Sequence, residues 1–193
     1  MSGALLELEN QKALATDAAL MVRVASRDSD AYDLLVDHHL NGMVGLAHRI
    51  LGDQGEAEDV VQESFVKLWQ KASSWQPNAM IRTWLFRVVY NACVDRLRHR
   101  REIALEKMPE LIDEADNPLD LLLKKSMALR VRQALATLPE RQRVAITLLH
   151  HLGFSQIDGA SIMGVSVEAF ESLSARGRRA LRKKLAVEKK DWI

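Results

Sequence analysis

The sequence contains few of the residues that build disulfide-linked, metal-bound or membrane-spanning proteins. Cys93 is the only cysteine among 193 residues, which excludes an internal disulfide and a zinc site made of several cysteines. No apolar run approaches the roughly 18 residues of a membrane span. The amino terminus, MSGALLELENQK, lacks the basic segment and apolar core of a secretion signal. These absences predict a cytoplasmic chain without direct membrane insertion.

Signatures of strands and of enzymes are also scarce. Aromatic residues make up 5% of the chain, and no segment alternates apolar and polar residues as a half-buried strand does. The sequence has neither a glycine-rich phosphate loop nor a nucleophile elbow. His38, His39, His48, His150 and His151 have no acidic partners at ligand spacing. We therefore expect no metal, no cofactor and no catalytic site.

Long segments with helical periodicity fill most of the chain and predict an all-α fold. The only four prolines fall between these segments or in their first turns, where a missing N–H costs little. The expected helices span residues 17–27, 30–51, 54–72, 80–100, 118–137, 140–151, 155–163 and 167–188.

Charge is strongly segregated although the net charge is only +1. Residues 53–63 carry five acids and no base, and residues 82–101 carry six arginines and one acid. Residues 102–123 carry seven acids against one lysine, whereas residues 127–193 carry twelve basic and six acidic side chains. Such blocks suggest separate surfaces for separate partners, although a solvated surface can also be blocky.

The acidic stretch after residue 101 divides the chain. It loses helical periodicity and contains Pro109, as linkers do. We predict two small helical domains joined by a flexible acidic linker. The predicted boundaries are an amino-terminal segment at 1–17, a first domain at 18–101, the linker at 102–125 and a second domain at 126–193.

The segment 54–72 has two distinct faces. Its predicted core face follows the spacing i, i+3, i+4 and consists of Ala57, Val60, Val61, Ser64, Phe65 and Leu68. The opposite stripe mixes acids with apolar residues and consists of Asp59, Gln62, Glu63, Val66, Trp69 and Gln70. A solvated face rarely includes a tryptophan, so this stripe is a candidate protein-binding surface. The alternative is that Trp69 packs on a neighbouring helix.

The segment 80–100 combines a predicted buried face with a polar edge. The expected buried residues are Ile81, Trp84, Leu85, Val88, Val89 and Ala92. Arginines contact phosphates, an asparagine amide can bind a base edge, and an aromatic ring can stack on an unpaired base. The candidate nucleic-acid residues are Trp75, Asn78, Arg82, Arg87, Asn91, Asp95 and Arg98. Each feature alone would be more typical of a solvated face.

The carboxyl-terminal segment has the pattern of a helix-turn-helix. A short helix, a turn at residues 164–166 and a long helix follow one another, and Ser166 is a suitable amino-terminal cap. The candidate DNA-contacting residues are Ser166, Glu168, Glu171, Ser172, Arg176, Arg178 and Arg179. Gly159 and Gly177 within helices imply either reduced stability or close helix approach. A helical bundle that binds no DNA is the alternative.

The ordered motifs resemble the extracytoplasmic-function (ECF) class of bacterial RNA polymerase sigma factors over about residues 18–188. The first half contributes AHRILGDQGEAEDVVQESFVKLWQ and TWLFRVVYNACVDRLRHRR. The second half contributes ALATLPERQRVAITLL, GFSQIDGASIMGVS and ARGRRALRKKL. A lone helix-turn-helix would be weak support, whereas the complete ordered set is specific.

The resemblance implies a partner for each surface. The stripe containing Asp59, Gln62, Glu63 and Trp69 would bind the clamp helices of the largest subunit of core RNA polymerase. The edge around Asn91 would bind the minus-ten promoter element, and the helix-turn-helix would bind the minus-thirty-five element beside the polymerase flap. The acidic linker would follow the RNA path. A membrane-anchored anti-sigma factor would hold the protein inactive, sometimes at the inner membrane.

The second long helix departs from the family pattern at its reading positions. Glu171, Ser172 and Leu173 stand where a basic residue, serine and arginine are common, and Ser174 replaces an aliphatic core residue, so that Leu173 is expected to share the packing. A carboxylate in the major groove can accept a hydrogen bond from the cytosine amine. We therefore predict that Glu171 selects a distinct promoter set, while Glu168 complements the helix dipole.

Two other classes of protein are alternatives to a promoter-specificity subunit. A stand-alone helix-turn-helix regulator would use its amino-terminal half for ligand binding or dimerisation. An enzyme has little support in this sequence. The stripe in segment 54–72 distinguishes the first two classes, because only a sigma factor requires it for transcription by core polymerase.

Overall fold

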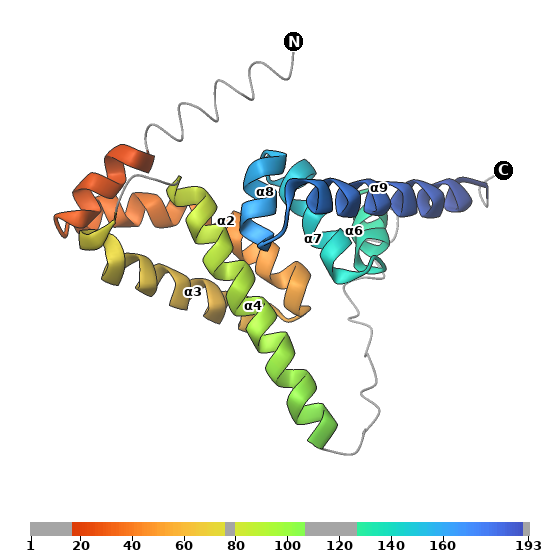
Figure 1. Ribbon diagram of the computed structural model, residues 1–193, viewed down its shortest axis with the longest axis horizontal. Helices are drawn as coiled ribbons and strands as arrows, with labels where there is room; N and C mark the ends of the chain where they lie inside the picture. Colours follow the sequence, from red (N-terminus) through yellow and green to blue (C-terminus); the bar gives the residue numbers. More distant parts are fainter. Residues whose placement is uncertain (1–16, 76–79, 107–126, 191–193) are drawn as a thin grey trace, which may run out of the picture. The chain divides into compact units, whose positions relative to one another are not determined.

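The computed structural model describes residues 17–75, 80–106 and 127–190 (Figure 1). All regular structure in these ranges is helical, as predicted. The chain divides into two compact units, one made chiefly of residues up to Val94 and the other chiefly of residues after it. The predicted segment 1–17, apart from its last residue, and most of the predicted linker lie outside the described residues.

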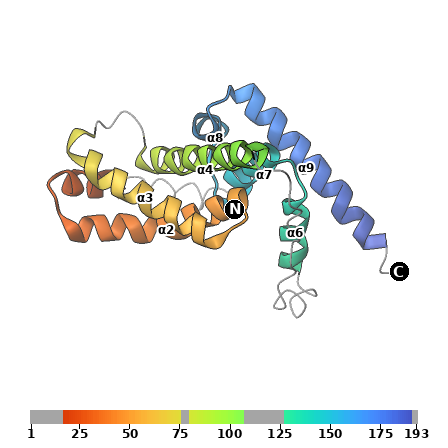
Figure 2. The ribbon, with the colours of Figure 1, turned by 90° about the horizontal axis from the view of Figure 1, so that it is seen from below.

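The first unit begins with a helix at residues 17–25. It continues with α2 (Ser29–Leu51), α3 (Gln54–Lys71), the short 3-10 helix η1 (Ala72–Ser74) and α4 (Ile81–Glu106). Helices α2 and α3 lie side by side (Figure 2). The expected ranges agree closely with these bounds, except that α4 extends six residues further than expected.

Capping residues set the corner between α2 and α3. Gly52 ends α2 in the left-handed conformation, with φ of 77°, and its N–H donates to the His48 carbonyl at 2.9 Å. Asp53 then begins α3, because its carboxylate accepts a hydrogen bond from the Glu56 N–H at 2.8 Å. Glycine and aspartate are well suited to these two positions. The dipeptide therefore places the start of α3 directly after α2.

The core of the first unit confirms the predicted face of α3 and corrects that of α4. All six predicted core residues of α3 are buried. In α4, Trp84, Val88 and Ala92 are only half-buried, whereas Phe86, Tyr90 and Cys93 are buried. Apolar residues occupy most of the circumference of α4, so periodicity alone does not fix which side faces inward. The buried side is the one that carries the large rings of Phe86 and Tyr90.

A buried carboxylate joins the first helix to α2. Asp17 accepts hydrogen bonds from His39 Nε2 at 2.8 Å and from His38 Nδ1 at 3.2 Å. Burial alone would raise the pKa of the Asp17 carboxyl, but the hydrogen bonds and positive charge of His39 and His38 outweigh it. The pKa therefore lies below its ordinary value of 3.8. His39 is a buried core residue, whereas His38 is exposed.

The depressed pKa of Asp17 makes the stability of the first unit sensitive to acid. A group whose pKa is lowered by folding stabilises the fold above its unfolded pKa and loses that contribution as the pH falls through the folded value. We expect the free energy of unfolding to fall more steeply between about pH 5 and pH 3 in the wild type than in Asp17→Asn. Urea unfolding at the two pH values measures this, and parallel decreases would contradict the assignment.

The second unit contains α6 (Met127–Ala136), α7 (Glu140–Ile146), the π-helical turn η2 (Thr147–His151), α8 (Gln156–Met163) and α9 (Val167–Lys190). The expected helix at 118–137 is confirmed from Met127 onward, and its earlier residues lie outside the described ranges. The expected helix at 140–151 continues to His151 but widens into the π-turn after Ile146.

The two helical glycines of the second unit lie where helices approach closely. This agrees with one of the two explanations that the sequence allows, the other being reduced stability. A Cβ added to Gly159 of α8 would lie 2.3 Å from the ring of Phe170 in α9. A Cβ added to Gly177 of α9 would lie 2.5 Å from Ile146 Cδ1 in α7. The absence of side chains at these two positions therefore allows α9 to pack against both neighbours.

Candidate nucleic-acid and protein interfaces

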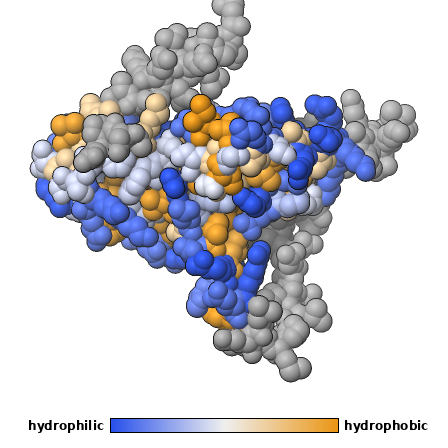
Figure 3. Space-filling view, in the orientation of Figure 1, coloured by the Kyte–Doolittle hydropathy of each residue, from blue (hydrophilic) through white to orange (hydrophobic). Residues whose placement is uncertain are grey.

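The predicted protein-binding stripe of α3 is exposed and continuous. Asp59, Gln62, Glu63 and Val66 are exposed, and the Val66 side chain retains 47% of its accessible area. These four residues, with Lys67 and Gln70, line one shallow depression. The outer edge of α3 is predominantly hydrophilic (Figure 3). An exposed apolar residue framed by acids and amides is typical of a protein-binding surface.

Trp69 lies at the margin of this stripe. It is half-buried, and its ring packs edge-on against Tyr32 of α2 with centroids 5.1 Å apart. The Arg27 guanidinium lies 5.2 Å from the Trp69 ring centroid. The tryptophan thus packs partly on a neighbouring helix, which was the alternative considered from the sequence. Its role in partner binding stays a prediction.

The polar edge of α4 brings together four of the predicted nucleic-acid residues. Arg87, Asn91, Asp95 and Arg98 are exposed, and their spacing places them on one side of the helix. Arg98 forms an ion pair with Asp95 at 3.0 Å, so part of its charge is already compensated. This side of α4 offers guanidinium donors and one amide within a few helical turns.

Arg82 is not part of this edge in the structure. Arg82 lies about 140° around the helix from Arg87, and its guanidinium is 5.9 Å from the centroid of the Phe86 ring. If Arg82 contacts nucleic acid as predicted, it does so on a different side of α4 from Arg87. Asn78 lies outside the described residues.

Trp84 is a candidate residue that sequence reasoning assigned to the core. It is half-buried, and its ring meets Trp75 edge-on with centroids 5.6 Å apart. Helical geometry places Trp84 about 20° from Asn91 around α4. The correction to the α4 core face thus adds a second aromatic ring to the predicted minus-ten surface. In the motif W-L-F-R both aromatic residues are apolar, so the sequence alone does not tell which of them is buried.

The turn between α8 and α9 has the predicted helix-turn-helix geometry. Gly164 adopts φ of 62°, and the Val165 N–H donates to the Ala160 carbonyl at 3.1 Å. Ser166 Oγ then accepts a hydrogen bond from the Ala169 N–H at 3.2 Å, which confirms Ser166 as the cap of α9. Glycine at the left-handed position and serine at the cap are the expected residues for such a turn.

Glu168 belongs to the same cap. Its pKa lies below the ordinary value of 4.5, because the carboxylate accepts hydrogen bonds first from its own backbone N–H and then from the Ser166 hydroxyl. A carboxylate in the first helical turn also complements the helix dipole. These contacts agree with the structural role expected for Glu168 and leave Glu171, one turn later, as the acidic candidate for base contact.

The exposed face of α9 is divided into a middle and two flanks. Because helical residues are about 100° apart, Ser172 and Arg179 lie near the middle of this face. Glu171 and Arg176 lie on opposite flanks, about 140° apart. Glu171, Arg176, Arg178 and Arg179 are exposed and Ser172 is half-buried.

The buried side of α9 contains the family departure noted above. Ser174 is 2% exposed and satisfies its hydroxyl by donating to the Glu171 carbonyl at 2.9 Å. Leu173 is half-buried and so shares in the packing, as expected. The hydrogen bond explains how a serine is accommodated at this core position.

Within residues 17–75, 80–106 and 127–190, no group of three histidine, cysteine, aspartate or glutamate side chains could hold a metal ion. Over the same residues, no helix has both the length and the apolarity that crossing a membrane requires.

The sequence matches two family models, one in each unit. Residues 35–103 match sigma-70 region 2, and residues 128–181 match sigma-70 region 4. The two matched segments contain the α3 stripe, the α4 edge and the helix-turn-helix. The predicted identity of these modules is thereby confirmed.

Curated relatives match most of the chain. The RNA polymerase sigma-H factor of Pseudomonas aeruginosa is 31% identical over 88% of this chain and 93% of its own length. The ECF RNA polymerase sigma-E factor of Haemophilus influenzae is 32% identical over 88% of this chain and 95% of its own length. The ECF sigma factor SigW of Bacillus subtilis is 29% identical over 84% of this chain and 93% of its own length.

Solved structures agree with these relatives. CnrH, solved with the cytosolic domain of CnrY, is 27% identical, with a TM-score of 0.67 over 89% of this chain and 98% of that chain. The sigma factor RpoE of Bartonella quintana, solved with the anti-sigma factor NepR, is 27% identical, with a TM-score of 0.65 over 81% of this chain and 97% of that chain. With both family regions and nearly full-length relatives matched, the chain belongs to the extracytoplasmic-function sigma factors of bacterial RNA polymerase.

Proposed function

We propose that this transcription initiation factor binds core RNA polymerase through the α3 stripe and promoter DNA through α4 and α9. The observation that carries the proposal is the separation of one acidic, partly apolar surface from two arginine-bearing ones. Acidic side chains repel DNA phosphates, whereas arginines attract them. The stripe around Asp59 and Glu63 is therefore suited to the polymerase clamp helices and the other two surfaces to nucleic acid.

The α4 edge is assigned to the minus-ten element, where the strands separate. Arg87 and Arg98 would contact phosphates, and the Asn91 amide has the donors and acceptors to bind a base edge. The half-buried rings of Trp75 and Trp84 would stack on an unpaired base, which offsets the few kcal/mol that unstacking costs. Asn78 and Arg82 remain part of this proposed surface by resemblance to the family.

The helix α9 is assigned to the duplex minus-thirty-five element. Arg178 and Arg179 would anchor phosphates, and Arg176 would approach the groove from one flank while Glu171 approaches from the other. The second domain would also meet the polymerase flap, and the acidic linker proposed at 102–125 would follow the RNA path. The proposed domains stay at 18–101 and 126–193.

We further assign control of this chain to an anti-sigma factor. CnrH and RpoE are each similar to this chain over most of its length, and RpoE was solved bound to an anti-sigma factor. A partner that masked the α3 stripe would prevent polymerase binding without altering the fold. The assignment includes membrane anchoring of that partner, with this protein itself in the cytoplasm.

The proposed division of labour is tested by measuring two binding reactions on the same full-length chain. Fluorescence anisotropy of the labelled chain should report nanomolar-range binding to core polymerase. An excess of unlabelled ECF sigma factor should displace the labelled chain. Duplex promoter DNA alone should bind more weakly and with a steep salt dependence. Tight, salt-insensitive DNA binding without any affinity for core polymerase would favour the stand-alone regulator instead.

Reversing the charge of Glu171 should change promoter preference rather than abolish DNA binding. We expect Glu171→Arg to exchange a preference for cytosine at one upstream position for guanine, with a change of about tenfold in relative binding. Selection of upstream elements from a randomised duplex library measures this. Glu168→Gln is the control, because its carboxylate is engaged in the helix cap. An unchanged preference in Glu171→Arg would remove this residue from base recognition.

A further inference from the structure

Arg27 has an unusual backbone conformation. Its φ of 66° is the only positive value of a non-glycine residue in the described ranges. The left-handed conformation costs a long side chain roughly 1 kcal/mol, and such strain persists only where the surrounding structure imposes it. A glycine would adopt the same conformation without that cost. The presence of arginine therefore directs attention to what its side chain contacts.

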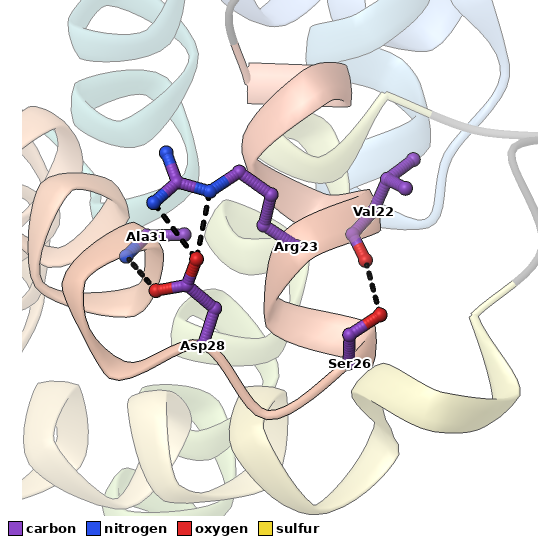
Figure 4. A network of polar contacts seen from close by, with 5 residues as sticks. All are labelled: Val22, Arg23, Ser26, Asp28 and Ala31. Atoms are coloured by element: carbon purple, nitrogen blue, oxygen red, sulfur yellow. Dashed lines mark hydrogen bonds and ion pairs between the residues drawn. The ribbon is translucent and has the colours of Figure 1, made fainter.

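Polar contacts lie on both sides of the turn that holds Arg27 (Figure 4). The Asp28 carboxylate caps α2 by accepting from the Ala31 N–H at 3.1 Å, and it forms an ion pair with Arg23 at 2.8 Å. The Ser26 hydroxyl donates to the Val22 carbonyl at 3.4 Å. These contacts hold the end of the first helix and the start of α2, on either side of Arg27.

The Arg27 side chain reaches the carboxyl end of α3. Its Nη1 donates a hydrogen bond to the Trp69 carbonyl at 2.9 Å, across 42 residues of sequence, and its guanidinium lies over the Trp69 ring. Trp69 stands in the last turn of α3, where carbonyl groups lack partners within the helix. A cation at this end also complements the helix dipole. Arg27 therefore acts as a distant cap for α3.

The residues after this cap lead directly to the aromatic pair. The Ser74 hydroxyl donates to the Lys71 carbonyl at 3.0 Å, and the Trp75 N–H donates to the Ala72 carbonyl at 3.2 Å. Trp75 directly follows Ser74, and its ring packs edge-on against that of Trp84 in α4. A short hydrogen-bonded path thus connects the Arg27 contact to the proposed minus-ten surface.

We infer that Arg27 is a positioning residue for promoter opening, because it fixes the end of α3 and thereby the place of Trp75 against Trp84. This inference rests on the proposed function of the α4 edge. Arg27 itself need not touch DNA or polymerase in this role. Its side chain is retained in a strained turn because its contact with Trp69 is needed further along the chain.

Arg27→Gly separates the positioning role from a role in stability. The substitution removes both contacts with Trp69 and also removes the strain of the positive φ. We expect a melting temperature within roughly 3 °C of the wild type, because the lost contacts and the relieved strain oppose one another. Affinity for core polymerase should change less than about twofold, because the four exposed residues of the α3 stripe, Asp59, Gln62, Glu63 and Val66, are not touched.

Promoter opening should be the property that changes. Permanganate reactivity of minus-ten thymines in complexes with core polymerase is expected to fall about tenfold on duplex promoter DNA. Run-off transcription by the same complexes should fall about as much on duplex DNA, but should stay within about twofold of the wild type on a template whose minus-ten region is already unpaired. Arg23→Ala is the matched control, because it removes the same charge from the end of the first helix without touching Trp69 and leaves the Asp28 cap of α2 in place. It should open the duplex normally.

The possible results distinguish the inference from the function on which it rests. If the wild type supported transcription from neither template, the proposed function itself would fail. If the wild type transcribed both and Arg27→Gly opened and transcribed the duplex equally well, only the positioning role would be overturned. Equal loss on duplex and unpaired templates would assign Arg27 a purely structural role and would also overturn the inference.

Discussion

Gly159→Ala is expected to destabilise the second unit, although alanine is normally the better helix former by about 1 kcal/mol. The added Cβ would lie 2.3 Å from the Phe170 ring, which is fully buried. Overpacking of this kind costs about 2 kcal/mol, or roughly 10 °C in the melting temperature of a small domain. Hydrogen exchange of α8 and α9 amides should rise, as measured by mass spectrometry.

Two further variants make the result specific to helix contact. Phe170→Leu in the Gly159→Ala background should restore part of the lost stability, because the smaller side chain leaves room for the methyl group. Gly55→Ala in α3 is the matched control, since its Cβ would meet only the Asp53 carboxylate at 3.4 Å. A Gly159→Ala protein as stable as the wild type would contradict the close packing of α8 on α9.

Reversing the acidic charges of the α3 stripe should abolish most of the affinity for core polymerase. Asp59→Lys combined with Glu63→Lys replaces two exposed acids one helical turn apart. If these acids face a basic surface of the clamp, the loss should reach at least about 30-fold, or about 2 kcal/mol. Titration of labelled core polymerase measures the affinity, and multi-round transcription should fall in proportion.

The control for this variant has the same charge change and spacing on another helix. Asp33→Lys combined with Asp37→Lys alters two exposed acids of α2 that are also four residues apart. We expect it to bind core polymerase within about threefold of the wild type. Binding of the α3 variant to duplex upstream DNA should be undiminished. An equal loss of affinity for core polymerase in both double variants would mean that net charge, and not the position of the acids on α3, explains the effect.

Much of the fold could be predicted because local signals agree. The α3 segment has an unambiguous apolar stripe, so its six buried residues follow from spacing alone. The corner at Gly52 and Asp53 and the cap at Ser166 combine suitable residues with the start or end of periodicity. At such positions, propensity, capping and burial favour the same structure.

The predictions from the sequence fail where the local pattern of residues is compatible with more than one packing arrangement. In α4, Trp84 and Phe86 are both large and apolar, and only tertiary packing decides that Phe86 is buried and Trp84 half-exposed. The link between Arg27 and Trp69 spans 42 residues and leaves no mark on the periodicity of either segment. An arginine at a position that favours glycine is a signal that could be sought only once the turn is known.

The most direct test is run-off transcription by core RNA polymerase on a library of promoters with randomised minus-ten and minus-thirty-five elements. Addition of the wild-type protein should start transcription from a defined subset with a common spacing between two elements. Core polymerase without the protein, or with the Asp59→Lys, Glu63→Lys variant, should give no enrichment of that subset. Transcripts that are independent of the protein, or a subset unchanged by the α3 substitutions, would contradict the assignment of its surfaces.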